Sequence, residues 1–269
     1  MTATRRLAVL AVLVAGLLAG LLTAPGPAAA LPITAAPRIL MLGDSITWQV
    51  CGGQGERFTS DAPQYLRDRD GGCYGLSGAT TADMAFVAGG GRFFDGGGQP
   101  HPWFPDRGMN NVFDVREAIT RADVLVIGLG TNDSNRSVGC GQATQTPWPI
   151  QVSRPAHEGG DNVPCQVSPT EFAQHLTYFV WLSGGKPIFW FDVAVTNPDD
   201  PAYPNQQAYN DAIWAAAGRY PNFHPVAWNR AVQAHPEWLR DDGVHLRSPA
   251  GNAGRYSTLI AALTGCGYR

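Results

Sequence analysis

Short apolar runs alternate along the chain with segments whose apolar residues recur at helical spacing. Two of these segments, residues 112–121 and 206–217, are predicted to be helices. Four short runs are predicted to be strands of a sheet: residues 38–42, 123–129, 187–193 and 223–228. Because strands that alternate with helices favour a mainly parallel sheet covered on both faces, we expect a three-layer α/β/α sandwich.

Two further helix starts are marked by local chemistry. Ser168 and Glu171 have the spacing of a capping box, and Pro169 stands at the first helical position. Ser248 and Pro249 mark the start of the last helix. Apolar residues of that helix repeat at helical spacing: Tyr256, Leu259, Ile260 and Leu263.

Two long stretches break the alternation of strands and helices. Residues 89–108 are rich in glycine and carry several aromatic side chains, and residues 134–167 contain two cysteines with several prolines. Connections of this length in a compact domain are usually functional loops or disordered segments. We expect two long loops without regular structure, inserted in a single domain that spans residues 31–269.

The N-terminus has the pattern of a secretory signal peptide. Arg5 and Arg6 precede an apolar run from Leu7 to Leu22, and small residues follow up to Ala30. The apolar run is shorter than the roughly 20 residues that span a bilayer, and a retained membrane anchor is the alternative interpretation. We expect a signal peptide over residues 1–30, cleavage after Ala30, secretion, and no stable membrane span in the chain that remains.

Composition and charge exclude two broad classes of protein. The formal net charge is −3 at pH 7, so the chain offers no basic surface for nucleic acid. The 8 Trp, 8 Tyr and 11 Phe residues bury enough apolar surface to offset the entropy of ordering, which argues against a disordered chain. We therefore expect a folded monomer that does not bind nucleic acid.

Five cysteines point to disulfide bonds, because an exported chain meets an oxidising compartment. Their spacing fits no zinc-binding pattern. Proximity along the chain predicts the pairs Cys51–Cys73 and Cys140–Cys165, each closing one loop, and leaves Cys266 unpaired.

Candidate chemistry begins directly after the first predicted strand. The sequence Gly43-Asp44-Ser45 places a serine at the carboxyl end of that strand and at the start of a helix. Open α/β sheets bind ligands at this edge, and a helix N-terminus favours negative charge that develops nearby. Taken alone, a helix N-cap is the simpler interpretation of Ser45.

Three further motifs follow in order at the ends of predicted elements. They are Ser-Gly-Ala-Thr-Thr at residues 77–81, Gly-Thr-Asn-Asp at residues 130–133 and Asp-Gly-Val-His at residues 242–245. Together with the motif around Ser45, they resemble the SGNH, or GDSL, hydrolase superfamily over nearly all of the chain from Arg38 to Leu263. The resemblance implies a flavodoxin-like α/β/α fold and a serine esterase.

The resemblance gives each motif residue an expected role. Ser45 is the expected nucleophile, His245 the base that takes its proton, and Asp242 the carboxylate that orients His245. The backbone N–H groups of Ser45 and Gly78, with the side-chain amide of Asn132, are the expected oxyanion hole. This chemistry requires neither a metal nor another cofactor.

Neighbouring polar residues are expected to be structural. Asp44 is interpreted as bonding to the backbone near its turn, and Asp133 as holding its own loop. Asp241 neighbours Asp242, but the three-residue spacing to His245 favours Asp242 as the partner. The remaining histidines, His175 among them, are interpreted as surface or hydrogen-bonded residues.

These roles imply a reaction class but no particular substrate. The expected reaction is hydrolysis of acyl esters through an acyl-serine intermediate. Trp48, Trp103 and Trp148 are candidates for stacking on sugar rings, or equally for packing the loops. We expect an ester on carbohydrate or cell-envelope glycan. The alternatives are a lipase or lysophospholipase-type esterase, an O-acyltransferase that uses the same residues, and an inactive glycan-binding module.

Overall fold

A computed structural model of the chain describes residues 36–51, 57–75, 78–89, 115–134, 143–145, 151–153 and 167–268. The predicted signal peptide, residues 1–30, lies outside these ranges, as do most residues of the two predicted long loops. The predicted domain of residues 31–269 is therefore described in part, and its described segments include all five strands of the central sheet.

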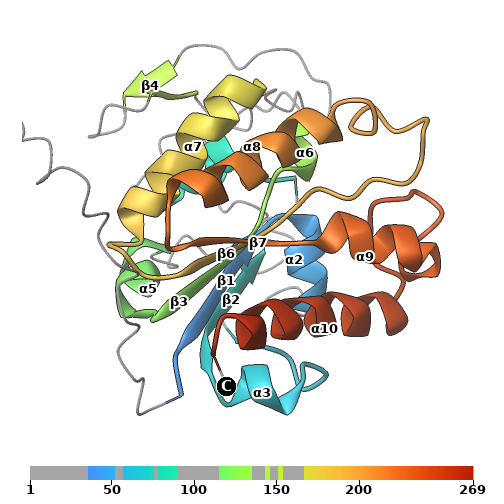
Figure 1. Ribbon diagram of the computed structural model, residues 1–269, viewed down its shortest axis with the longest axis horizontal. Coiled ribbons are helices and arrows are strands. Elements are labelled where there is room, and N and C mark those ends of the chain that lie inside the picture. Colours follow the sequence, from blue (N-terminus) through green and yellow to red (C-terminus); the bar gives the residue numbers. More distant parts are fainter. Residues whose placement is uncertain are drawn as a thin grey trace, which may run out of the picture. The chain divides into compact units, whose positions relative to one another are not determined.

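A single parallel sheet forms the centre of the described fold (Figure 1). Its strand order is β2-β1-β3-β6-β7, which corresponds to the flavodoxin-like order 2-1-3-4-5 when only these strands are counted. The strands span Ile39–Gly43 (β1), Asp70–Gly75 (β2), Val124–Gly128 (β3), Ile188–Phe191 (β6) and Phe223–Val226 (β7). Every residue of β1 and β3 is buried, as expected for central strands covered on both faces.

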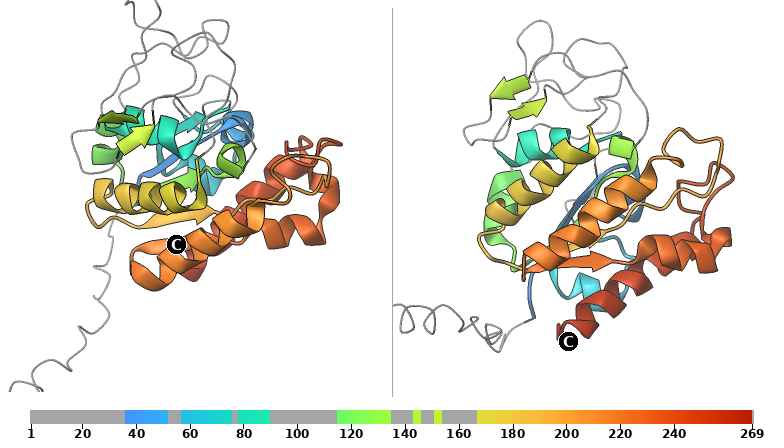
Figure 2. Two further views of the ribbon diagram at one scale, coloured as in Figure 1. Left: turned by 90° about the horizontal axis from the view of Figure 1, so that it is seen from above. Right: turned by 45° about the horizontal axis from the view of Figure 1, so that its top comes forward.

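Helices cover both faces of the sheet, as Figure 1 and Figure 2 show. One face carries α4 (Thr81–Ala88), α5 (Val115–Arg121), α7 (Pro169–Leu182) and α8 (Gln206–Arg219). The opposite face carries α2 (Ser45–Val50) and α10 (Ala250–Gly265). The shorter elements are α3 (Gln64–Arg67), α6 (Thr131–Ser134), α9 (Trp228–Ala234) and the 3-10 turn η3 (Pro236–Trp238). The predicted three-layer α/β/α sandwich is therefore confirmed.

The longest described helices each bury one side. α7 and α8 have 14 residues each and α10 has 16. Phe172, Leu176 and Phe179 of α7 are buried, as their helical spacing predicts. In the part of the chain that the structure describes, no helix is both long and apolar enough to cross a membrane.

Capping chemistry determines where two of the helices begin. Ser168 and Glu171 form the predicted capping box of α7: the Ser168 N–H donates to Glu171 Oε2 (2.8 Å) and the Glu171 N–H to Ser168 Oγ (3.2 Å). Thr80 and Asp83 form a second capping box at the start of α4, which the sequence analysis did not single out. The last helix begins at Ala250, just after the predicted start.

The stretch from residue 134 to 167 contains regular structure that the hydrophobic pattern did not predict. β4 (Ala143–Gln145) pairs with β5 (Gln151–Ser153) in a two-stranded antiparallel sheet. Strands of three residues are too short to show an alternating pattern, so the prediction of a loop without regular structure was wrong at these positions.

A disulfide joins the end of α2 to β2. Cys51 and Cys73 are bonded, with their Cα atoms 5.4 Å apart, and both side chains are buried. This is the first predicted pair, whereas Cys140 and Cys165 lie outside the described residues. The thiol of Cys266 is free and exposed, with its Sγ 3.8 Å from His224 Nδ1.

Replacing both Cys51 and Cys73 by serine should lower the free energy of unfolding by about 3 kcal/mol, because the bond restricts the unfolded chain across a sequence separation of 22. Chemical denaturation followed by tryptophan fluorescence measures the change. The matched control is Cys266→Ser at an exposed thiol, which should change stability by less than about 0.5 kcal/mol. Equal stability of the double variant and the control would contradict this role of the disulfide.

Candidate active site

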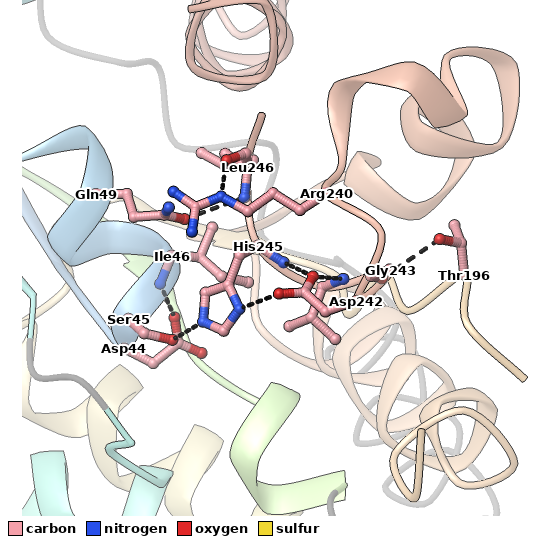
Figure 3. A network of polar contacts seen from close by, with 11 residues as sticks. Asp44, Ser45, Ile46, Gln49, Thr196, Arg240, Asp242, Gly243, His245 and Leu246 are labelled. Carbon is pink, nitrogen blue, oxygen red and sulfur yellow. Dashed lines mark hydrogen bonds and ion pairs between the residues drawn. The ribbon is translucent and has the colours of Figure 1, made fainter. Parts of the chain in front are cut away.

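The structure brings Ser45 together with His245 and Asp242, which lie about 200 residues further along the chain (Figure 3). Ser45 is the first residue of α2 and follows the carboxyl end of β1 by two positions. Nε2 of His245 lies 3.0 Å from Ser45 Oγ, and Nδ1 of the same ring lies 2.9 Å from Asp242 Oδ2. A hydroxyl, an imidazole and a carboxylate are thus connected in series.

The loop that carries Asp242 and His245 is held in place by its own hydrogen bonds. Asp242 Oδ1 accepts the N–H groups of Val244 and His245, both at 2.9 Å. The N–H of Leu246 donates to Gln49 Oε1 on α2 (3.0 Å), so the loop is anchored to the helix that bears Ser45 (Figure 3).

The same hydrogen bonds keep the Asp242 carboxylate ionised. Partial burial alone would raise the pKa of Asp242, but the N–H groups of His245 and Val244 and the His245 side chain outweigh it and lower the pKa. The neighbouring Asp241 instead forms an ion pair with Arg247 (2.6 Å) and is almost fully exposed. The spacing argument that favoured Asp242 over Asp241 therefore agrees with the contacts of both residues.

The residues expected to form the oxyanion hole follow three adjacent strands of the sheet. Ser45 follows β1, Gly78 follows β2, and Asn132 lies in α6 after β3. Asn132 Nδ2 donates to the carbonyl oxygen of Ala79 (2.9 Å), and an amide nitrogen carries a second N–H. Gly78 has a φ of +81°, a backbone conformation that residues other than glycine adopt only with strain.

A row of glycines lets α2 approach the sheet closely. Gly43 of β1 is in register with Gly75 of β2 and with Gly128 of β3. A Cβ atom at Gly43 would lie 2.0 Å from Thr47 Oγ1, and one at Gly75 would lie 2.0 Å from the backbone nitrogen of Trp48. Side chains in this row would therefore push away the helix that carries Ser45. From the sequence alone, Gly43 is visible only as part of the motif around Ser45.

Beneath Ser45 lies a buried group of charged side chains. Asp44, Asp192 and Arg255 line one small cavity together with apolar neighbours. Asp44 Oδ1 accepts the N–H of Ile46 (2.9 Å), which agrees with its expected structural role at the turn. The Arg255 guanidinium lies over the Phe191 ring, with Cζ 3.8 Å from the ring centroid.

Burial favours the neutral form of all three groups and shifts their pKa values accordingly. It raises the pKa of Asp44 to about 6, an effect that the charges of Arg255 and His245 oppose. Burial raises the pKa of Asp192 to about 6 as well, and lowers that of Arg255 to about 10. Arg255 was missed in the sequence. Its signal was the four-residue spacing to Leu259, which puts a charge on the apolar side of α10.

Asp133, which is expected from the sequence to hold its own loop, also binds another segment. Both of its carboxylate oxygens accept the N–H of Thr81, at 3.0 and 3.1 Å, and one also accepts the Thr81 hydroxyl. His175, interpreted from sequence as a surface or hydrogen-bonded residue, is buried, and its Nδ1 lies 2.8 Å from Thr81 Oγ1. Pairing across more than 50 residues leaves no local sequence signal.

The roles predicted for several tryptophans stay predictions. Trp103 and Trp148 lie outside the described residues, as does Ser77. Trp48 lies on α2 and is partly buried, with its backbone against Gly75. Among the described residues, no group of three or more His, Cys, Asp and Glu side chains is arranged to hold a metal ion.

Comparison with known proteins identifies the fold. No protein-family model matches the chain, and no curated protein is similar to it in sequence. A solved mutant of an acetylxylan esterase from Geobacillus stearothermophilus is similar in structure, with a TM-score of 0.54 and 17% identity over 87% of this chain and 96% of that one.

Two further solved structures are similar to a comparable extent. The catalytic domain of peptidoglycan O-acetyltransferase A from Streptococcus pneumoniae has a TM-score of 0.52 and 13% identity over 86% of this chain and 94% of that one. A GDSL-like lipase from Bacteroides thetaiotaomicron has a TM-score of 0.51 and 15% identity over 88% and 92%. The chain therefore has the fold of the SGNH, or GDSL, hydrolase superfamily that its four motifs resemble.

Proposed function

We propose that the protein is a secreted serine esterase of the SGNH type, which hydrolyses acyl esters through an acyl-serine intermediate. The observation that carries the proposal is the series of hydrogen bonds from Ser45 Oγ to His245 Nε2 (3.0 Å) and from His245 Nδ1 to Asp242 Oδ2 (2.9 Å). A serine hydroxyl is a weak nucleophile until a base removes its proton, and this arrangement supplies the base and its orienting carboxylate.

In the proposed first step, Ser45 Oγ attacks the carbonyl carbon of the ester while its proton passes to His245 Nε2. The ionised Asp242 accepts the Nδ1–H and stabilises the imidazolium that forms. When the tetrahedral intermediate collapses, the alcohol leaves with the proton of His245. Water then attacks the acyl-serine by the same route, releasing the carboxylic acid and restoring Ser45.

The negative oxygen of the intermediate needs hydrogen-bond donors that are already in place. We assign this role to the N–H groups of Ser45 and Gly78 and to the side-chain amide of Asn132. Their positions after three adjacent strands support the assignment, because the carboxyl ends of parallel strands meet at one edge of the sheet. The bond from Asn132 to the Ala79 carbonyl supports it further, since it fixes the orientation of the amide.

For the substrate, we propose an acyl group on a carbohydrate or on a cell-envelope glycan, with acetate as the first acyl group to test. Two of the similar structures are named as an acetylxylan esterase and as a peptidoglycan O-acetyltransferase, which supports a glycan. The N-terminal pattern of residues 1–30 and the Cys51–Cys73 disulfide support export to an oxidising compartment. An inactive glycan-binding module is disfavoured, because it predicts a broken series of hydrogen bonds.

Ser45→Ala should lower kcat for p-nitrophenyl acetate by a factor of about 10⁴ or more, because it removes the nucleophile. The melting temperature should stay close to that of the parent protein. A fluorophosphonate probe followed by intact mass and peptide mapping should label Ser45 in the parent and nothing in the variant. The control is Ser257→Ala at an exposed serine of α10, which should keep full activity. Retained turnover in Ser45→Ala would remove Ser45 from the mechanism.

Asn132→Ala should lower kcat by about a hundredfold, close to 3 kcal/mol of transition-state stabilisation, with little change in KM, because the lost donor acts on the intermediate. Asn222→Ala is a matched control. The Asn222 amide donates to the Lys186 carbonyl (2.8 Å) in a turn, so its loss should affect stability and leave kcat unchanged. Equal kcat values for the two variants would contradict an oxyanion role for Asn132.

A series of p-nitrophenyl esters of increasing acyl length, assayed beside acetylated xylan and acetylated peptidoglycan, tests the substrate class. We expect the highest kcat/KM for acetate and release of free acetate from a glycan. A preference for long acyl chains would instead support a lipase-type esterase. Transfer of acetate to a second glycan hydroxyl, detected by mass spectrometry, would support an O-acyltransferase.

A further inference from the structure

A buried chain of hydrogen bonds runs behind the proposed oxyanion hole. It connects Asp133 of α6, Thr81 of α4 and His175 of α7, whose side chains are all 2% exposed or less. The Thr81 hydroxyl bonds to Asp133 Oδ1 on one side and to His175 Nδ1 on the other, the latter at 2.8 Å. The triad proposed for catalysis uses none of these groups.

This chain of hydrogen bonds joins the two segments that carry the Gly78 and Asn132 donors. Asp133 directly follows Asn132, and Thr81 lies three residues after Gly78. The Thr81 N–H donates to both oxygens of Asp133 at 3.0 and 3.1 Å, and Asn132 Nδ2 donates to the Ala79 carbonyl at 2.9 Å. Two adjacent residues of one segment therefore bind two positions of the other, which fixes both their separation and their relative orientation.

The protonation states of the three groups decide which group donates and which accepts in each of these hydrogen bonds. Burial lowers the pKa of His175 to about 4, although the charge of Glu171 opposes this, so the imidazole is neutral at pH 7. Burial raises the pKa of Asp133 to about 7 and the charge of Asp83 adds to the rise, while the bonds from Thr81 oppose it. Above that pH the carboxylate can only accept, so Thr81 donates its one hydroxyl proton to Asp133 and accepts the Nδ1–H of His175.

We propose that Thr81, Asp133 and His175 form a positioning unit that holds the Gly78 and Asn132 donors at the separation required by a tetrahedral oxyanion. The unit rests on the proposed esterase function and adds to it three residues that do not touch the substrate. Donors of an oxyanion hole act at 2.7–3.1 Å from the oxygen, and a misplacement of about 1 Å costs on the order of a hundredfold in rate.

The Thr81 hydroxyl is the one group that contacts both other members, so it offers the sharpest test. Thr81→Val keeps the shape of the side chain and removes the hydroxyl, which leaves Asp133 and His175 unconnected. Thr81→Ser keeps the hydroxyl and removes only a methyl group. At pH 8, we expect kcat of Thr81→Val to fall by at least about tenfold with little change in KM, and Thr81→Ser to stay within about threefold of the parent.

A double-variant cycle with Asn132→Ala separates positioning from general loss of stability. If Thr81 acts through the oxyanion donors, Thr81→Val should reduce kcat far less in the Asn132→Ala background than in the parent. Equal fold-losses in the two backgrounds would overturn the proposal, as would Thr81→Ser being as slow as Thr81→Val. Ser168→Ala, which weakens the capping box of α7, is a control that should lower stability and leave kcat unchanged.

Hydrogen–deuterium exchange gives a readout that does not depend on turnover. Thr81→Val should increase exchange in residues 78–84 and in residues 131–134 together, whereas Thr81→Ser should do so in neither segment. If the parent hydrolyses no ester, the proposed function fails while this measurement still tests the unit, and unchanged exchange in Thr81→Val overturns it. Should Thr81→Val not fold, His175→Leu replaces it, with His175→Asn, which keeps a donor near the Nδ1 position, as its partner.

Discussion

The close contact between α2 and the sheet is the constraint on which the candidate site depends. Gly43, Gly75 and Gly128 stand in register across three neighbouring strands, and a Cβ atom in this row would collide with Thr47, Trp48 or Arg255. Without those side chains, the first turn of α2 lies directly at the carboxyl edge of β1. Ser45 is then near enough to hydrogen-bond to His245, which lies in a loop 200 residues further along the chain. The hydrogen bond from Leu246 to Gln49 holds that loop against the same helix.

Three carboxylates around this edge show how environment assigns different tasks to one residue type. Asp242 is partly exposed and accepts two backbone N–H groups and the His245 side chain, so its pKa is lowered and it stays ionised beside the imidazole. Asp44 is fully buried, caps α2 and faces the positive charge of Arg255. Asp133 is also fully buried but faces a hydroxyl and a backbone N–H, which makes it a link between segments. Desolvation acts on all three, and the hydrogen bonds available at each position decide the outcome.

The arrangement also separates the moving charge of the proposed reaction from the fixed charges of the core. The series Ser45–His245–Asp242 lies at the surface end of the sheet, where His245 and Asp242 are about two-fifths exposed. The Asp44–Asp192–Arg255 group lies beneath it, with Arg255 stacked on Phe191. The buried cation of Arg255 offsets part of the negative charge of the two buried carboxylates, which would be more expensive in the low-dielectric interior without it.

The sequence by itself determined the layers of the fold and the four motifs, because each depends on residues close together in the chain. Proximity along the chain also predicted the Cys51–Cys73 pair, and the structure contains this bond. Apolar runs, capping boxes and the three-residue spacing of Asp242 and His245 are local patterns that a single sequence displays. The tertiary structure alone decided that Asp133 binds Thr81, that His175 binds the same Thr81 hydroxyl, and that Arg255 lies beneath Asp44. Those contacts join residues 52 or more positions apart, and their geometry arises only when adjacent strands bring distant segments to one edge of the sheet.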